Sequence, residues 1–155
     1  MNPQPGRIML KGFGECLPRY ENYMDIDPGV KDTYGIPVVR FHMKYAENEM
    51  AMIQDMADTA AEMMEAAGAK NVVPYTVPDR LPGWGIHEVG MARMGRDPKK
   101  SALNPFQQSH DVNNLFVMDG AGFTSTACQN PTLTIMALSV RSCDHLMDEM
   151  KRGNI

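Results

Sequence analysis

Two stretches of this chain have the apolar spacing of a long helix, and glycine and proline punctuate most of the rest. Apolar side chains recur every three or four positions in residues 47–67, and again after Pro131. The 155 residues include 13 glycines and 11 prolines, which favour turns and loops. The sequence therefore predicts two helices in a loop-rich chain that is long enough for about one domain.

Residues 38–45 alternate between apolar and polar side chains. Val39 and Phe41 fall on one face and Arg40 and His42 on the other, which is typical of a half-buried, antiparallel strand. Residues 1–28 are rich in turn-forming residues and are predicted to be irregular. A strand of this kind together with two long helices predicts fold class α+β, with helices accompanying an antiparallel sheet.

The two helices carry start and stop signals. Asn48 is suited to cap the first helix, and Gly68 stands where a left-handed residue commonly ends one. Pro131 suits the first position of the second helix, and Gly153 follows its basic last turn. The buried stripe predicted for the second helix consists of Leu133, Met136, Ala137, Val140, Cys143, Met147 and Met150.

Composition excludes several classes of function. The net charge of −4 argues against nucleic acid as a partner, and no run of about 18 apolar residues predicts a membrane span. Residues 1–11 lack an apolar signal region, which leaves cytoplasm and periplasm both open. Cys16, Cys128 and Cys143 are an odd number without a Cys-x-x-Cys pair, so we expect reduced thiols.

Metal and nucleotide motifs are incomplete. His87-Glu88 begins like a zinc-protease motif, but Met91 stands where the second histidine belongs, so no metal site is predicted. Gly-x-Gly triplets begin at Gly12, Gly83 and Gly120, and none continues as the dinucleotide-binding fingerprint. The sequence thus has no recognisable cradle for the ADP half of a dinucleotide.

Three separated segments carry a more specific pattern. Residues 87–95 read His-Glu-Val-Gly-Met-Ala-Arg-Met-Gly, residues 114–120 read Asn-Leu-Phe-Val-Met-Asp-Gly, and residues 130–134 read Asn-Pro-Thr-Leu-Thr. In this order and spacing they closely resemble the C-terminal signature of the glucose–methanol–choline (GMC) oxidoreductases, which are FAD-dependent enzymes that oxidise alcohols and sugars. The family pattern has threonine where Met91 stands.

The front half looks like the substrate-domain segment of the sugar-oxidising branch, which includes gluconate dehydrogenase-like and glucoside 3-dehydrogenase-like enzymes. The resemblance lies in Gly14-Glu15-Cys16-Leu17-Pro18, Glu21-Asn22 and the segment from Lys31 to Pro37. It implies that residues 1–110 are a portion of the substrate-binding domain. Residues 111–155 would then supply a strand and a helix of the FAD domain, the strand being the apolar run 115–118.

The resemblance also implies roles for individual residues. His87 matches the base that takes the proton of the substrate hydroxyl while hydride passes to flavin N5, and Asn130 would hold the substrate oxygen. Imidazole suits proton transfer because its pKa lies near neutral pH. Asp119 and Gly120 match the strand end that meets the ribityl–pyrophosphate part of FAD. Asn130, Pro131 and Thr132 would open a helix beside the flavin pyrimidine, where the positive end of the dipole stabilises developing negative charge.

The family's FAD fingerprint lies far upstream of this signature, and this chain lacks it. We therefore expect the C-terminal part of an FAD-dependent sugar or alcohol oxidoreductase: a fragment, a truncated reading frame or one piece of a split enzyme. Such a piece would need the missing N-terminal FAD domain as its partner and would be inactive alone. The alternative is a catalytically silent domain that self-associates through strand edges and methionine-rich faces.

Overall fold

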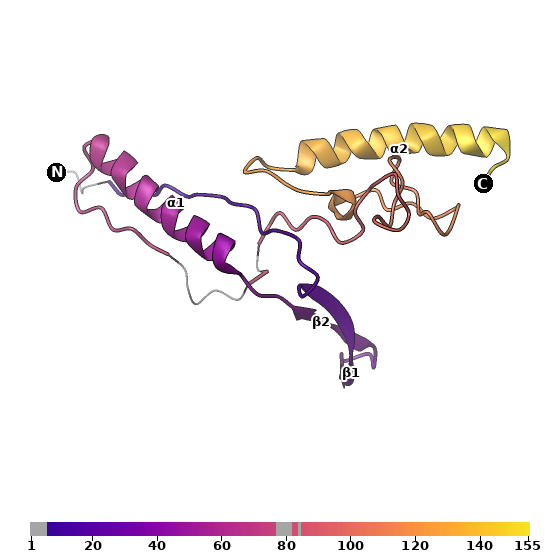
Figure 1. Cartoon of the computed structure of the whole chain (residues 1–155), viewed down its shortest axis with the longest axis horizontal. Helices are drawn as coiled ribbons and strands as arrows, with labels where there is room; N and C mark the ends of the chain where they lie inside the picture. The colour runs from indigo at the N-terminus through magenta and orange to yellow at the C-terminus, as the bar shows by residue number, and fades with distance from the viewer. Residues whose placement is uncertain (1–5, 77–81, 84) are drawn as a thin grey trace. The chain divides into compact units, whose positions relative to one another are not determined.

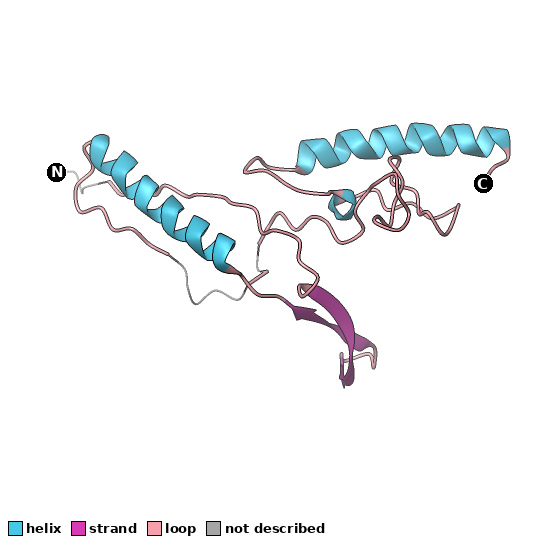
Figure 2. Cartoon of the chain, in the orientation of Figure 1, coloured by secondary structure: helices cyan, strands magenta, loops and turns pink. Residues whose placement is uncertain are grey.

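A computed structural model describes residues 6–76, 82, 83 and 85–155, and the chain divides into two compact units (Figure 1). Unit 1 consists of Met1–Cys16 and Glu21–Pro82, and unit 2 of Leu17–Tyr20 and Gly83–Ile155. Unit 1 contains β1 (Tyr23–Lys31), β2 (Pro37–His42) and α1 (Glu47–Ala66); unit 2 contains the 3₁₀ turn η1 (Gly120–Gly122) and α2 (Thr132–Arg152). Loops connect these elements (Figure 2). The α+β class is confirmed.

Strands β1 and β2 form an antiparallel hairpin, so the predicted strand and its orientation are confirmed. The prediction that residues 1–28 are irregular is wrong for β1. The turn signal Asp27-Pro28-Gly29 lies inside β1, where the register shifts between Ile26 and Lys31. The Asp27 carboxylate accepts the amides of Gly29 and Val30 at 2.8 and 3.1 Å, which lets the strand continue past the irregularity.

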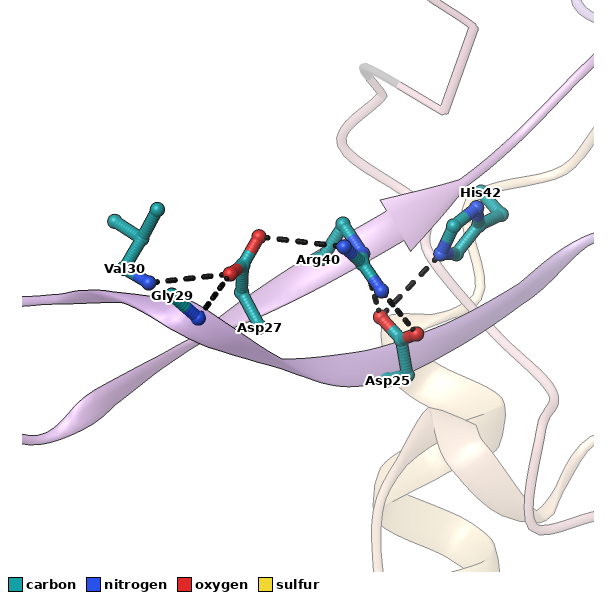
Figure 3. A network of polar contacts seen from close by, with 6 residues as sticks. All are labelled: Asp25, Asp27, Gly29, Val30, Arg40 and His42. Carbon is teal, nitrogen blue, oxygen red and sulfur yellow. Dashed lines mark hydrogen bonds and ion pairs between the residues drawn. The ribbon is translucent and has the colours of Figure 1, made fainter.

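One face of the hairpin carries a cluster of charged side chains (Figure 3). Arg40 donates to the Asp25 carboxylate from Nη2 at 2.7 Å and from Nε at 2.9 Å. His42 Nε2 lies 3.3 Å from Asp25 Oδ1, and the His42 ring stacks on Tyr23 with centroids 4.2 Å apart. The Arg40 guanidinium holds the pKa of the Asp25 carboxyl below its usual value, and His42 adds to this effect.

The opposite face of the hairpin is apolar and exposed. Register places Met24 opposite Phe41 and Ile26 opposite Val39, and these four side chains are 47–72% exposed. Exposed apolar patches of this kind are uncommon on free domains.

Helix α1 begins after Ala46 rather than at a cap supplied by Asn48, which lies within its first turn, so that prediction is wrong. Glu49 is buried, and its Oε2 accepts the Ala46 amide at 2.9 Å, where the positive end of the helix dipole favours a carboxylate. Gly68 follows the helix with φ of +82° and its amide donates to the Glu65 carbonyl. The predicted glycine stop is confirmed.

The segment around Gly12 and Gly14 runs beside α1 (Figure 1). A Cβ atom on Gly12 would lie 2.7 Å from Met56 Sδ, and one on Gly14 would lie 2.5 Å from Met52 Sδ. Glycine therefore lets the backbone approach the helix, and these methionines are packing residues of unit 1.

Helix α2 is confirmed, but its predicted buried stripe is wrong. Leu133, Met136, Val140, Met147 and Met150 are 54–78% exposed, and Ala137 and Cys143 are exposed as well. The face turned into unit 2 carries hydroxyls: Ser139 donates to the Met118 carbonyl at 2.8 Å and Ser142 to Gln107 Oε1 at 2.9 Å. The interior of unit 2 is built from loops, whose polar groups need hydrogen-bond partners, and the serines supply them.

The loop between residues 93 and 118 forms isolated bridges rather than strands. Leu103, only 2% exposed, accepts the Gly95 amide and donates to the Arg93 carbonyl. Residues 115–118 were predicted to be a strand, which is wrong: their one bridge pairs Phe116 with Gln108. A strand needs a continuous ladder, and this bridge supplies a single rung. None of the helices in the described part of the chain is apolar enough over sufficient length to cross a membrane.

Candidate active site

The three signature segments meet in unit 2. The Gly90 amide donates to the Gly120 carbonyl at 2.9 Å, and the Met94 amide donates to the Gly122 carbonyl at 2.8 Å. The segment that follows His87 therefore runs along the turn η1. The structure thus joins two motifs that are about 30 residues apart in the sequence.

Gly120 lies close to both the first signature segment and the start of α2. It is buried, and a Cβ atom there would lie 3.1 Å from Val89 Cγ1, 3.3 Å from the Glu88 carbonyl oxygen and 3.4 Å from Ile135 Cδ1. Ile135 lies in the first turn of α2 and directly follows the third signature segment, residues 130–134. Glycine lets η1 approach both the first segment and α2, since an added Cβ would be tight against these neighbours.

The turn before η1 is held by its own side chain and by α2. The Asp119 carboxylate accepts the Ala121 amide at 2.8 Å and so caps η1. One residue earlier, the Met118 carbonyl accepts the Ser139 hydroxyl. The predicted tight turn at Asp119-Gly120 is confirmed, and its carboxylate is exposed at the surface of unit 2.

His87 is half-buried and lies three residues before Gly90. Glu88 Oε1 accepts the Gly85 amide at 3.1 Å, which shapes the loop on either side of the histidine. Met91, the departure from the family pattern, has φ of +77° and a side chain that is 65% exposed. A left-handed conformation is costly for a side chain of this size, so the chain accepts backbone strain four residues after the histidine.

Helix α2 begins at Thr132, with Pro131 at the cap position and Asn130 exposed just before it. The proline was predicted at the first helical position, and the difference of one residue is ordinary for a helix end. The cap residue supplies no side-chain oxygen to the first-turn amides. These amide donors and the positive end of the dipole suit a hydrogen-bond acceptor.

Sequence reasoning missed one residue of this region, Gln107. It is fully buried, has φ of +60°, and donates from Nε2 to the Asp119 carbonyl at 3.3 Å while accepting from Ser142. A glutamine in a loop gives no signal in the sequence, because neither periodicity nor a motif marks it.

The remaining histidines of unit 2 have local partners. His110 Nε2 lies 3.1 Å from Ser101 Oγ and 3.2 Å from the Gly95 carbonyl oxygen, and the His145 ring stacks on Phe106 at 4.1 Å. Within residues 6–76, 82, 83 and 85–155, no cluster of three or more histidine, cysteine or acidic side chains could hold a metal ion.

Residues 18–139, most of the chain, match the GMC oxidoreductase family. The chain therefore belongs to the GMC oxidoreductase family, whose members use FAD.

Similar proteins are oxidoreductases of alcohols and sugars. The chain is 39% identical over 139 residues to 2-methyl-1,2-propanediol dehydrogenase of Mycolicibacterium austroafricanum, which covers 90% of the chain. It is 34% identical over 147 residues to the gluconate 2-dehydrogenase flavoprotein of Pantoea cypripedii, covering 92% of the chain. It is 33% identical over 151 residues to C-glycoside 3-oxidase of Arthrobacter globiformis, covering 94% of the chain.

The chain spans about a quarter of the length of these relatives: 25%, 24% and 28%, respectively. The matched quarter contains all three signature segments described above.

Proposed function

We propose that this chain forms the proton-handling and flavin-contacting part of an FAD-dependent oxidoreductase acting on CH–OH groups of sugars or alcohols. The observation that carries the proposal is the hydrogen bond from Gly90 to Gly120, which brings the histidine segment to the turn that precedes α2. The names of the relatives, a diol dehydrogenase, a gluconate dehydrogenase and a glycoside oxidase, support the substrate class.

In this proposal His87 removes the proton of the substrate hydroxyl. A neutral imidazole is the side chain best suited to do so near neutral pH. Its loop is held on one side by the Glu88–Gly85 hydrogen bond and on the other by the Gly90–Gly120 bond. A base held in this way keeps its position while the substrate binds. Holding a catalytic group in a reactive geometry lowers the entropic part of the activation barrier.

Asn130 holds the substrate oxygen in this proposal. Its amide is exposed beside the start of α2 and can donate to an alkoxide that forms as the proton leaves. Asp119, Gly120, Pro131 and Thr132 would hold the cofactor, with the Asp119 carboxylate suited to accept from ribityl hydroxyls. FAD, when bound, supplies the acceptor for the hydride of the carbinol carbon.

We further propose that residues 1–110 belong to a substrate-binding domain and residues 111–155 to an FAD domain. The chain has no dinucleotide-binding fingerprint, so the ADP half of FAD must be held by another part of a flavoprotein. We expect the chain alone to bind FAD weakly and to be inactive.

The first experiment follows flavin fluorescence and absorbance while FAD is titrated into the purified chain. Tight binding with substrate-dependent bleaching would contradict the need for a separate FAD-binding part. The second experiment places His87→Ala in a complete flavoprotein that carries this segment. Loss of the base is expected to slow flavin reduction by at least about 10²-fold.

His145→Gln is the matched control, because His145 lies in the same unit, stacks on Phe106 and approaches the signature segments only through the tilted ring of Phe116, 6.5 Å away. It should leave the rate of flavin reduction unchanged. A His87→Ala protein that reduces its flavin at the original rate would refute the assigned role.

A further inference from the structure

We infer that Gln107 is a positioning residue of the site, which holds the turn Asp119–Gly122 and, through it, the segment that carries His87. The inference rests on the proposed function, because it assigns Gln107 a role in that site. Gln107 is one of the few fully buried side chains in the described part of the chain.

The Gln107 side chain joins the turn to helix α2. Nε2 donates to the Asp119 carbonyl at 3.3 Å, and Oε1 accepts the hydroxyl of the equally buried Ser142 at 2.9 Å. Ser142 thus orients the amide so that its NH₂ group faces the turn. A Cβ atom on Gly122 would lie 3.1 Å from Nε2, so the turn packs closely on this amide.

The Gln107 backbone is bonded as fully as its side chain. Its amide donates to the Asn104 carbonyl at 3.1 Å, and its carbonyl accepts the Val117 amide at 2.9 Å. Its φ of +60° is unfavourable for glutamine and persists only where the surroundings determine it. Such over-determined positions are typical of residues that orient a functional site.

The far side of the turn is bonded to the histidine segment. Gly120 and Gly122, whose carbonyls accept the amides of Gly90 and Met94, lie one and three residues after Asp119. Moving the Asp119 peptide would therefore move the acceptors that fix the segment after His87. Gln107 acts on His87 through this chain of contacts and touches no reacting atom.

The test measures amide hydrogen exchange in the complete chain for Gln107→Glu. At neutral pH the introduced carboxylate still accepts from Ser142 but no longer donates to the Asp119 carbonyl. We expect the protection of the Gly90 and Met94 amides to fall about tenfold, the effect of losing one buried hydrogen bond. Gln108→Glu is the matched control, because Gln108 lies in the same loop and donates to the Asn113 carbonyl instead.

A pH series separates positioning from general destabilisation. Burial raises the pKa of a carboxyl group. When protonated, the introduced group can donate to Asp119 again, so protection at Gly90 should recover near pH 5 and be low near pH 8. Exchange that stays fast at both values, or that changes equally in Gln108→Glu, would overturn the inference.

Ser142→Ala keeps the test decisive if Gln107→Glu fails to fold. It removes the hydroxyl that orients the glutamine amide and should lower the protection of Gly90 and Met94 in the same direction. Unchanged protection in Ser142→Ala would overturn the inference.

In a complete flavoprotein, Gln107→Glu should lower kcat about tenfold at pH 8 with little change in KM, and an unchanged kcat would also overturn it. His87→Ala tests the proposed function separately. If flavin reduction survives that substitution, the proposed function fails whatever Gln107 does.

Discussion

The Gly90 amide and the Gly120 carbonyl are joined by a hydrogen bond of 2.9 Å, and Gly120 is packed so closely that a Cβ atom would lie 3.1 Å from Val89. This pair connects a loop that holds the candidate base to the turn that leads into α2. A side chain at residue 120 would press on Glu88 and Val89, next to this hydrogen bond, so the close approach favours glycine.

Gly120→Ala should therefore destabilise unit 2. The added methyl group would lie 3.3 Å from the Glu88 carbonyl oxygen and against Ile135, and such overpacking costs about 1–3 kcal/mol. Urea unfolding followed by circular dichroism measures the change. Gly6→Ala is the control, since nothing lies within 4 Å of a Cβ atom there, and an equal loss in both variants would contradict the packing argument.

Met91→Gly should stabilise the chain by about 1 kcal/mol. Met91 has φ of +77° with an exposed side chain, so glycine relieves backbone strain without removing buried contacts. Met63→Gly is the same substitution at an exposed helical position and should destabilise α1 by a similar amount. Denaturation midpoints should move in opposite directions, and a shared direction would argue against strain at Met91.

The hairpin should lose stability in acid. Because Arg40 lowers the pKa of Asp25, folding favours the ionised carboxyl, and the contribution is present above the unfolded-state pKa of about 3.9. It is lost as pH falls through the lower folded-state value. In nuclear magnetic resonance spectra, the cross-peaks between protons of Asp25 and Arg40 should weaken below about pH 4.

Asp25→Asn should remove that acid dependence, because the amide does not titrate in this range. Asp55→Asn, at an exposed position of α1, should leave it unchanged. An acid transition of the hairpin that persists in Asp25→Asn would assign it to another group.

Val140→Ala should change the free energy of unfolding by less than about 0.5 kcal/mol, because Val140 is exposed on α2. Leu103→Ala should cost about 2–5 kcal/mol, since Leu103 is buried at the centre of the loop bridges. Equal losses in thermal or urea unfolding would show that the apolar stripe of α2 is covered in solution.

Local patterns predicted the regular elements well. The period of α1, the glycine that ends it and the alternation of β2 reflect interactions within a few residues, which the sequence displays directly. Strand β1 was missed because its turn-forming residues are accommodated by the Asp27 side chain as an irregularity within the strand. Such tolerance depends on the partner strand and has no local signal.

The choice of buried face on α2 also depended on the tertiary structure. Amphipathic spacing favours burial of the Leu133–Val140 stripe, whereas the unit packs Ser139 and Ser142 inward. The sequence shows how apolar each helix face is, but the groups that a face contacts belong to residues about 20–35 positions away. Here those groups are a carbonyl and an amide, so hydroxyls satisfy them.

The sequence alone determined the family and the candidate residues His87, Asp119, Gly120, Asn130, Pro131 and Thr132, because the order and spacing of motifs are properties of the chain itself. Only the tertiary structure decided that Gly90 bonds to Gly120 and that Gln107 links the turn to α2. These contacts join distant residues through backbone carbonyls and a buried amide. Backbone groups are the same at every position, so no sequence pattern specifies which of them will meet.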